Sequence, residues 1–215
     1  MKILSATGGI AATNAYLVAD ETTRKAVIFD APDHTVAPLL DAAQKNGWEV
    51  IGLWLTHGHF DHLADHAEVT ARFPKAEVRI HRLDEPKLRR PNSSFFALPF
   101  SITPRGADGY FEDNQELKLG NLRLQVLYTP GHSPGHVMFY FPQEKVLIGG
   151  DLIIMGAVGR TDLPDANHAT LNASIRRVMK LPGDVRLYPG HGSPSTLREE
   201  PEQNPYVRGA VEDME

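Results

Sequence analysis

Four side chains that could bind a metal ion lie close together in the sequence: His57, His59, Asp61 and His62. Neutral imidazole and carboxylate are the usual protein ligands of zinc, iron and manganese. Residues 50–55 are mostly apolar and typical of a buried strand, so the cluster lies where that strand ends. Side chains at alternate positions of an extended chain share a face, so His57 and His59 can reach one ion together. Asp61 and His62 begin the next helix and point elsewhere, which favours a second ion over the alternative, a polar helix cap with spare histidines.

Three further segments place a candidate ligand at the end of a predicted strand or in a turn between strands: His132, Asp151 and His191. Residues 129–136 read TPGHSPGH, and His132 is preferred to His136 because His136 begins a strand. The carboxylate of Asp151 has two oxygens and can bridge two cations. Each segment is a weak signal alone, but ligands at four strand ends together predict a metal centre.

Composition excludes several classes of protein. The chain has 215 residues, of which 41% are hydrophobic and 23% charged, and this predicts one globular domain over residues 1–215 without a membrane segment. The absence of cysteine excludes disulfides, thiolate catalysis and cysteine-ligated zinc. The formal charge is −5 and the longest basic run is Arg89-Arg90, so nucleic acid is not an expected partner. Residues 1–12 lack a secretory apolar region, which predicts a cytoplasmic protein.

The first half of the chain reads as a hairpin followed by alternating helices and strands. Residues 15–19 and 25–30 are apolar and β-prone, and a turn separates them. Residues 30–33 read as a further turn. Residues 35–46 then place apolar side chains at helical spacing, and Gly47 is the predicted C-cap.

The remaining predicted elements continue through the rest of both halves. Helices are predicted at residues 62–72 and 171–181, the second capped by Asn167 or Asp165, and the tail from Arg198 is a predicted short helix or loop on the outside. Further strands are predicted at residues 77–81, 116–119, 122–128, 137–141, 145–149 and 185–188. Both halves run from strands to a helix to a strand that ends in histidine, which predicts two similar layers with helices on the outer sides of the sheets.

Residues 84–113 differ in composition from the rest of the chain. Four prolines and the aromatic residues Phe95, Phe96 and Phe100 lie in this segment. It is predicted to be long and irregular, and such segments commonly form lids or binding walls. The alternative is that the phenylalanines close the edge of the core.

The remaining histidines are assigned structural roles. His66 follows His62 by one turn of the predicted helix, and it is expected to support the site or to pack. Three others are expected at the surface: His34, His81 and His168.

The motifs together resemble the metallo-beta-lactamase fold superfamily over nearly the whole chain. They are HxHxDH at residues 57–62, TPGHSPGH at 129–136, GGD at 149–151 and YPGHG at 188–192. The resemblance implies a four-layer αβ/βα sandwich with the metals at one edge. It implies one metal site from His57, His59 and His132, a second from Asp61, His62 and His191, and Asp151 bridging them. Two zinc ions are expected, with iron or manganese as alternatives. Because the chain has no cysteine and has Asp151, antibiotic hydrolysis is not expected.

Residues 159–162 give a finer resemblance. The sequence GRTD is similar to the loop of small hydroxyacylglutathione hydrolases, which are glyoxalase II-like, and of persulfide dioxygenases. In those relatives a basic residue at the position of Arg160 implies contact with a glutathione carboxylate. The alternative role of Arg160 is an internal ion pair with Asp162 or a neighbouring carboxylate.

The predicted function is hydrolysis of a small-molecule thioester such as an S-hydroxyacyl glutathione. A metal-bound hydroxide would attack the carbonyl, with Asp61 orienting it, and the thiolate would leave without a strong general acid. The main alternative is a persulfide dioxygenase with one iron held by His57, His132 and Asp151. Hydrolysis of a lactone on the same site and a metal-binding module without catalysis are further alternatives.

Overall fold

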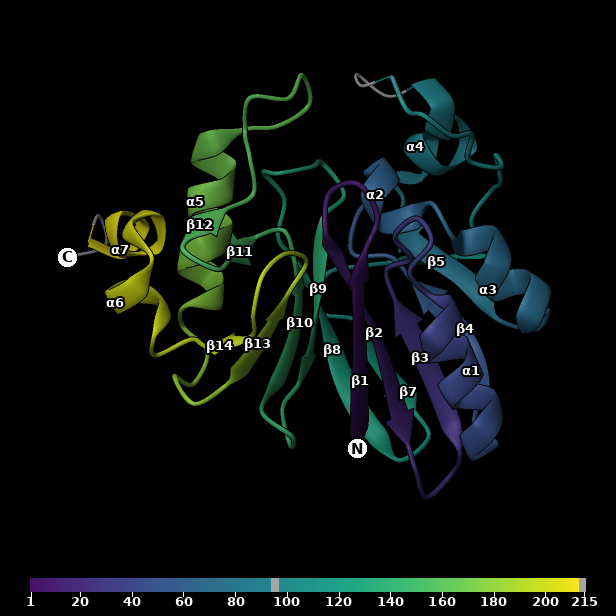
Figure 1. The fold of residues 1–215 in the computed structure, drawn as a ribbon. Coiled ribbons are helices and arrows are strands. Elements are labelled where there is room, and N and C mark those ends of the chain that lie inside the picture. Colours follow the sequence, from purple (N-terminus) through teal and green to yellow (C-terminus); the bar gives the residue numbers. More distant parts are fainter. Residues whose placement is uncertain (94–96, 213–215) are drawn as a thin grey trace.

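Two β-sheets lie face to face at the centre of the structure, and helices cover the outer side of each sheet (Figure 1). The computed structural model describes residues 1–93 and 97–212. In spatial order the first sheet consists of β1 (Lys2–Gly8), β2 (Thr13–Asp20), β3 (Lys25–Phe29), β4 (Glu49–Trp54), β5 (Glu77–His81) and β6 (Gly109–Phe111). The second consists of β14 (Ser195–Thr196), β13 (Arg186–Pro189), β10 (Val146–Gly150), β9 (Val137–Phe141), β8 (Leu122–Tyr128) and β7 (Glu116–Leu119). The predicted four-layer αβ/βα sandwich is confirmed.

Parallel pairing brings several strand ends to one edge of each sheet. In the first sheet, β3, β4, β5 and β6 pair parallel, whereas β1, β2 and β3 pair antiparallel. In the second sheet only the pair β10 and β13 is parallel among the described strands. A third, small sheet pairs β11 (Ile153–Ile154) with β12 (Ala157–Val158). The carboxyl ends of parallel strands are where open α/β sheets place their sites.

Helices supply the two outer layers. The helices are α1 (Ala37–Asn46), α2 (Phe60–Leu63), α3 (His66–Arg72), α4 (Glu85–Arg89), the 3₁₀ turn η1 (Pro91–Ser93), α5 (His168–Val178), α6 (Glu200–Gln203) and α7 (Pro205–Glu212). Helices α1 and α3 pack on the first sheet, and α5 and α7 pack on the second. The predicted C-terminal end of α1 is confirmed, because Gly47 adopts the left-handed conformation after Asn46, whereas the helix begins at Ala37, two residues later than predicted. The Asn167 side chain caps α5 by accepting a hydrogen bond of 2.8 Å from the backbone N–H of Thr170.

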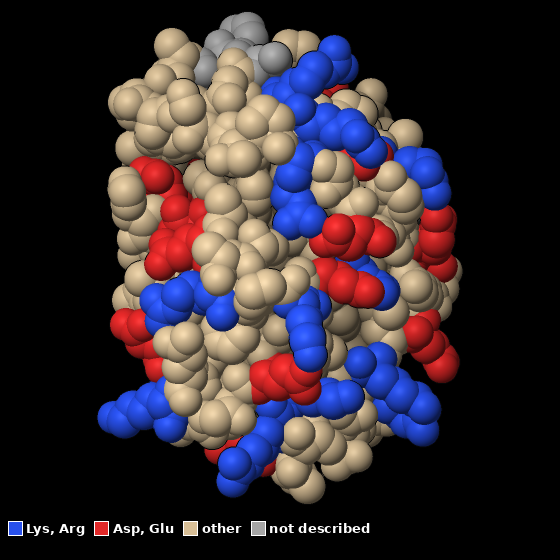
Figure 2. Space-filling view, turned by 90° about the vertical axis from the view of Figure 1, so that its right-hand side faces the viewer, with Lys and Arg blue, Asp and Glu red and all other residues tan. Residues whose placement is uncertain are grey.

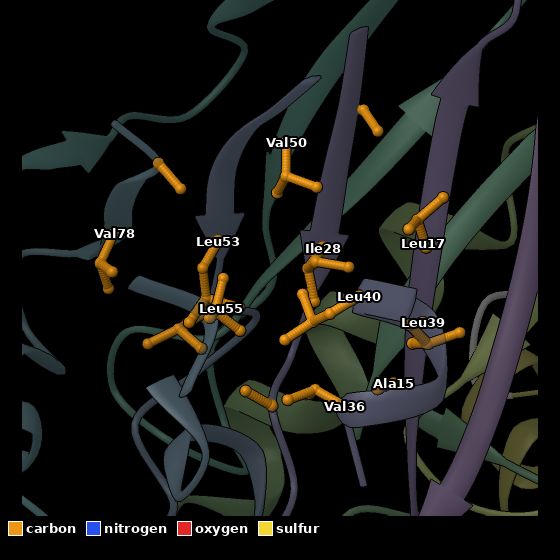
Figure 3. Packing of buried hydrophobic residues seen from close by; sticks show 14 of the residues in the cluster. Ala15, Leu17, Ile28, Val36, Leu39, Leu40, Val50, Leu53, Leu55 and Val78 are labelled. Atoms are coloured by element: carbon orange, nitrogen blue, oxygen red, sulfur yellow. The ribbon is translucent and has the colours of Figure 1, made fainter. Parts of the chain in front are cut away.

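Strand β2 shows how one strand serves two cores. Every residue of β2 is buried, because both faces of the sheet are covered. Ala15 and Leu17 join the cluster under α1, whereas Tyr16 and Val18 join the cluster between the sheets. Figure 3 shows side chains of α1 and of the first sheet meeting in the outer cluster. Side chains alternate between the faces of a strand, so the middle of β2, residues 15–19, is apolar at every position.

The predicted helix over residues 62–72 is wrong in one respect, because two helices occupy this region. Helices α2 and α3 are separated at Ala64 and Asp65. The Asp65 carboxylate accepts backbone hydrogen bonds from His34 at 3.0 Å and Thr35 at 2.8 Å, and its own N–H donates to Ala31 at 2.8 Å. These contacts with a distant loop interrupt the helix, and the local sequence does not indicate them.

Residues 84–113 contain more regular structure than predicted, because α4, η1 and β6 lie within them. Phe100 is partly buried against the outer core of the first sheet, as the core-edge alternative predicts. Phe95 and Phe96 lie outside the described residues. Strand β1 was not predicted, because its exposed and half-buried positions give only a weak apolar pattern.

The sequence predicts a surface position for His81, and this prediction is wrong. His81 is buried at the end of β5, where its ring stacks on Tyr128 with centroids 4.6 Å apart, because β5 and β8 face each other between the sheets. His34 and His168 are exposed, as predicted. Within residues 1–93 and 97–212, no helix combines the length and the hydropathy needed to cross a membrane.

Candidate metal centre

Seven predicted ligands come together at one edge of the sandwich, near α2 (Figure 1). Strand β4 leads into His57, His59, Asp61 and His62, the turn between β8 and β9 carries His132, and Asp151 and His191 follow β10 and β13. The paired sheets therefore bring together residues that are up to 134 positions apart, since His57 and His191 belong to one constellation. The ligand atoms form three groups within 4.8 Å: His57 with His59 and His132, Asp61 with His62 and His191, and His57 with His62 and Asp151.

Asp151 lies between the two outer groups. One carboxylate oxygen is 3.4 Å from His132 Nε2 and 3.2 Å from His191 Nε2, and the other is 3.4 Å from His62 Nε2. In the first group, His57 Nε2 is 3.1 Å from His59 Nδ1. His132 belongs to this constellation, whereas His136 lies beside it, so the geometry agrees with the preference for His132.

The outer nitrogens of four imidazoles are held by protein acceptors. His62 Nδ1 donates to Asp30 at 2.8 Å, His132 Nδ1 to the Arg160 carbonyl at 2.9 Å and His191 Nδ1 to the Ala11 carbonyl at 3.2 Å. His57 Nδ1 donates to the Thr56 hydroxyl at 3.0 Å, because that hydroxyl gives its own proton to Asp30. An imidazole whose outer nitrogen carries the proton turns its other lone pair toward the centre, as ligating histidines do.

The atoms that face the centre fit a divalent cation. His62 Nε2, His132 Nε2 and Asp151 Oδ1 are buried and have no hydrogen-bond partner among the described residues. Buried polar atoms without partners cost free energy unless something binds them. A set of imidazole nitrogens and carboxylate oxygens suits zinc, iron or manganese.

Two candidate ligands have pKa values suited to binding a cation at neutral pH. Burial, assisted by the neighbouring His132, lowers the pKa of His59 to about 4. Burial raises the pKa of Asp61, but protonated His62 and His191 outweigh it and lower that pKa to about 2. Both residues are therefore in the protonation state that metal ligands require. Burial lowers the pKa of His191, but Asp151 and Asp61 outweigh it and raise that pKa to about 10, so a cation that binds there displaces a proton from this ring.

A model of the metallo-beta-lactamase superfamily matches residues 8–191, which span every candidate ligand. The chain belongs to the metallo-beta-lactamase superfamily. Membership and the grouped histidines and aspartates together imply divalent-metal binding and support a metal-dependent hydrolase.

Relatives within this superfamily cover nearly the whole chain. The sequence is 32% identical over 205 residues to a probable metallo-hydrolase, YqgX, of Bacillus subtilis, covering 94% of this chain and 95% of the relative. It is 31% identical over 204 residues to the hydroxyacylglutathione hydrolase GloC of Haemophilus influenzae, covering 90% of this chain and 92% of the relative.

Solved structures of superfamily members are also similar. BLEG-1, a B3 metallo-beta-lactamase, is 30% identical with a TM-score of 0.87, covering 96% of this chain and 99% of that one. TTHA1623 in a di-iron-bound form is 36% identical with a TM-score of 0.76, and the match covers 94% of this chain and 99% of TTHA1623. ETHE1 from Myxococcus xanthus is 26% identical with a TM-score of 0.79, covering 97% and 85%.

The sequence analysis did not identify two buried aspartates that lie beside the candidate metal centre, Asp30 and Asp84. Asp30 follows β3 and accepts hydrogen bonds of 2.8 Å from the N–H and the hydroxyl of Thr56, as well as from His62. Asp84 precedes α4 and accepts from the Gly58 N–H at 2.8 Å. The sequence pattern predicts a turn at residues 30–33, although the place of Asp30 after a buried strand matches that of the candidate ligands.

His136 supports Asp151 from behind. Its Nε2 accepts a hydrogen bond of 2.9 Å from the Asp151 N–H, and its Nδ1 donates to the Thr129 hydroxyl at 2.8 Å. Burial lowers the pKa of His136 to about 3, so the ring stays neutral and keeps this acceptor.

A cavity of about 870 Å³ opens in front of the centre. His59, Asp61, His132, Asp151 and His191 form its floor, and its walls include Ile10, Leu98, Ile154, Val158, Leu163, Lys87, Arg90 and Arg160. The Arg160 guanidinium makes two hydrogen bonds of 2.6 Å to Asp162. The ion pair is the alternative role that the sequence offered for Arg160, although the residue also lines the cavity.

Proposed function

We propose that the protein hydrolyses a small-molecule thioester such as an S-hydroxyacyl glutathione, using two divalent ions, with zinc as the first choice. The single observation that carries this proposal is the arrangement of two three-residue groups on either side of Asp151, at the floor of a cavity large enough for a substrate. The hydroxyacylglutathione hydrolase GloC, 31% identical, supports the thioester class.

We assign one ion to His57, His59 and His132, the second to Asp61, His62 and His191, and both to Asp151. Two groups on opposite sides of a carboxylate with two oxygens favour a pair of ions over one. The similarity to a di-iron-bound structure, TTHA1623, is in line with two ions and keeps iron as an alternative to zinc.

The ions would supply Lewis acidity and lower the pKa of a bound water toward neutrality. The protein residues position the reactants. Thr13 donates a hydrogen bond of 2.9 Å to Asp61, which fixes that carboxylate so that its free oxygen can accept from and orient the attacking water. A thiolate is a good leaving group, so no general acid is needed opposite the centre. The apolar cavity walls would exclude bulk water from the thioester.

A persulfide dioxygenase is the second candidate. The likeness to ETHE1 from Myxococcus xanthus, 26% identical over 97% of this chain, is compatible with it. One iron at His57, His132 and Asp151 is the corresponding ligand set. The two functions differ in metal content and in their requirement for oxygen.

The test combines metal analysis of the protein as purified with a substrate screen. Two zinc ions per chain and turnover of S-lactoylglutathione are expected. One iron per chain with oxygen uptake on glutathione persulfide would instead establish the dioxygenase. The screen should include a lactone, and also the β-lactam nitrocefin because of the likeness to BLEG-1. Asp151→Ala and His59→Ala should abolish thioesterase activity with the circular dichroism spectrum kept, and substantial retained activity in either variant would refute the assignment.

A further inference from the structure

Two cations of the α4 region line the cavity, and only one of them has a carboxylate partner. Lys87 lies within α4, and Arg90 follows the last residue of the helix. Figure 2 shows the side of the molecule that lies on the right in Figure 1. Basic side chains gather toward the top of this side, at the end of the molecule where Figure 1 places α4. Arg90 is exposed, and no side chain within the described ranges forms an ion pair or hydrogen bond with its guanidinium.

The other charges on the cavity wall are compensated. Lys87 Nζ lies 2.6 Å from Asp165 and 3.2 Å from Asp84. Arg160 is held by Asp162 through two bonds of 2.6 Å. Arg90 is therefore an uncompensated positive charge on a wall that is otherwise apolar or neutralised.

The position of Arg90 separates it from the reacting centre. Lys87 packs beside the histidine segment, because a Cβ built on Gly58 would lie 3.0 Å from the Lys87 Cβ. Arg90 comes three residues later, which is about 4.5 Å further along a helix axis. The helix begins directly after Asp84, which contacts the histidine segment, so Arg90 lies at its far end. An anion bound by Arg90 would belong to a part of the substrate remote from the scissile bond.

We infer that Arg90 binds an anionic group, a carboxylate or a phosphate, on the thiol half of the substrate. This inference rests on the proposed thioester hydrolysis and narrows its substrate class to thioesters of an anionic thiol. A guanidinium stays charged at all working pH values and presents paired donors that match both anions. The apolar walls around it would contact the uncharged part of the same molecule.

Three lactoyl thioesters test the inference, because they share the acyl group and the reacting bond but differ in the charge of the thiol. They are the thioesters of glutathione, which bears carboxylates, of coenzyme A, which bears phosphates, and of N-acetylcysteamine, which is neutral. The test compares wild-type metal-loaded enzyme with Arg90→Gln. Because the contact is remote from the scissile bond, KM for the preferred anionic thioester should rise about tenfold with little change in kcat.

Matched variants distinguish a specific contact from general charge. Arg89→Gln removes the same charge one residue away, on a side chain paired with Glu85 outside the cavity lining, and it should not alter the preference for the anionic thioester. Arg90→Lys keeps the charge and should restore part of the affinity. The anionic thioester whose KM responds to Arg90→Gln identifies a carboxylate or a phosphate as the group bound.

Either of two kinetic outcomes would overturn the assignment to Arg90. Arg90→Gln could affect the charged and neutral thioesters equally, or Arg89→Gln could act as strongly as Arg90→Gln. If wild-type enzyme turns over no thioester, the proposed function fails separately, and calorimetric binding of S-hexylglutathione and of coenzyme A to the metal-loaded protein decides the inference. A Kd about ten times weaker in Arg90→Gln for either probe would support it, whereas an unchanged Kd, or no binding of either probe to wild type, would overturn it.

Discussion

Asp84 shows how a residue outside the candidate ligand set can fix the distance between two histidine segments. Its carboxylate is fully buried and accepts from Gly58 N–H at 2.8 Å, Ser133 hydroxyl at 2.7 Å and Gly135 N–H at 2.9 Å. Gly58 belongs to the first histidine segment, and Ser133 and Gly135 to the second. Burial raises the pKa of Asp84, but Lys87 and these hydrogen bonds outweigh it and lower the pKa.

Replacing Asp84 with Asn should destabilise the protein and weaken metal binding. Each carboxylate oxygen accepts a backbone N–H, so an amide NH₂ in either place would face a donor. We expect a loss of about 3 kcal/mol in the free energy of unfolding, because a buried charged acceptor is removed from several donors. Urea unfolding measures the stability, and competition with a zinc chelator measures the affinity.

Asp165→Asn is the control for Asp84→Asn. It removes the other carboxylate partner of Lys87 at a partly exposed position and should cost less than about 1 kcal/mol. Equal losses in the two variants would show that the ion pair with Lys87, rather than the link between the histidine segments, is what Asp84 contributes.

Among the elements, the turn between β8 and β9 depends on close contact with the first turn of α5. Gly131 precedes His132 and has a φ of 135°. A Cβ on Gly131 would lie 2.3 Å from the backbone nitrogen of Leu171, and the Asn167 N–H donates to the Gly131 carbonyl at 2.7 Å. The helix therefore holds the turn that presents His132.

Gly131→Ala should cost about 3 kcal/mol of unfolding free energy, because it combines backbone strain with a clash against backbone atoms. Gly156→Ala is the matched control, since Gly156 also has a positive φ, of 71°, but its Cβ would meet no atom within 4 Å. The control should lose about 1 kcal/mol from strain alone. Thermal and urea unfolding of both variants separate the effect of backbone strain from that of the clash. Similar losses of unfolding free energy in the two variants would show that the contact with α5 is unimportant.

A second link between elements joins the two sheets at the opposite end of the molecule. Asp20, at the end of β2, accepts from the Asn121 N–H between β7 and β8 at 2.7 Å, and from the Thr23 hydroxyl at 2.7 Å. The hydrogen bond from Asn121 is the largest cause that lowers the pKa of Asp20 below its ordinary value of 3.8.

The lowered pKa of Asp20 predicts a pH-dependent contribution to stability. A depressed pKa stabilises the folded state above the unfolded pKa, and the contribution disappears as pH falls through the folded value. Asp20→Asn should therefore lower the unfolding free energy by about 1 kcal/mol at pH 7, and the difference should shrink below pH 4. Urea unfolding of the metal-free proteins between pH 3 and 7 measures this. A difference that stays constant over this range would contradict an electrostatic origin.

At the scale of the whole molecule, the centre joins the two halves of the sandwich. The first sheet supplies His57, His59, Asp61 and His62, and the second supplies His132, Asp151 and His191. A cation bound by both sets would hold the sheets together at this edge. The assignment of residues 1–215 to one domain stays a prediction.

Chelation should therefore lower the melting temperature of the whole protein. Saturating metal at about 1,000 times its Kd adds about 4 kcal/mol, which corresponds to roughly 10 °C for a chain of this size. Differential scanning calorimetry with and without a chelator measures the change. His34→Ala, at an exposed site, should keep the full change, whereas His132→Ala should reduce it. A melting temperature that does not respond to chelation would contradict binding across the two sheets.

The sequence alone determined the candidate ligands and most elements, because those signals are local. Histidines and aspartates after apolar runs mark strand ends, and strands such as β5, β7, β8 and β9 have the predicted bounds. The tertiary structure decided what depends on distant contacts. Asp84 reaches residues 26 to 51 positions away, and Asp65 breaks a helix by bonding to a loop about 30 residues earlier. Only the tertiary structure shows which Lys and Arg side chains at the cavity have a carboxylate partner, because ion pairing depends on where side chains meet and not on their order along the chain.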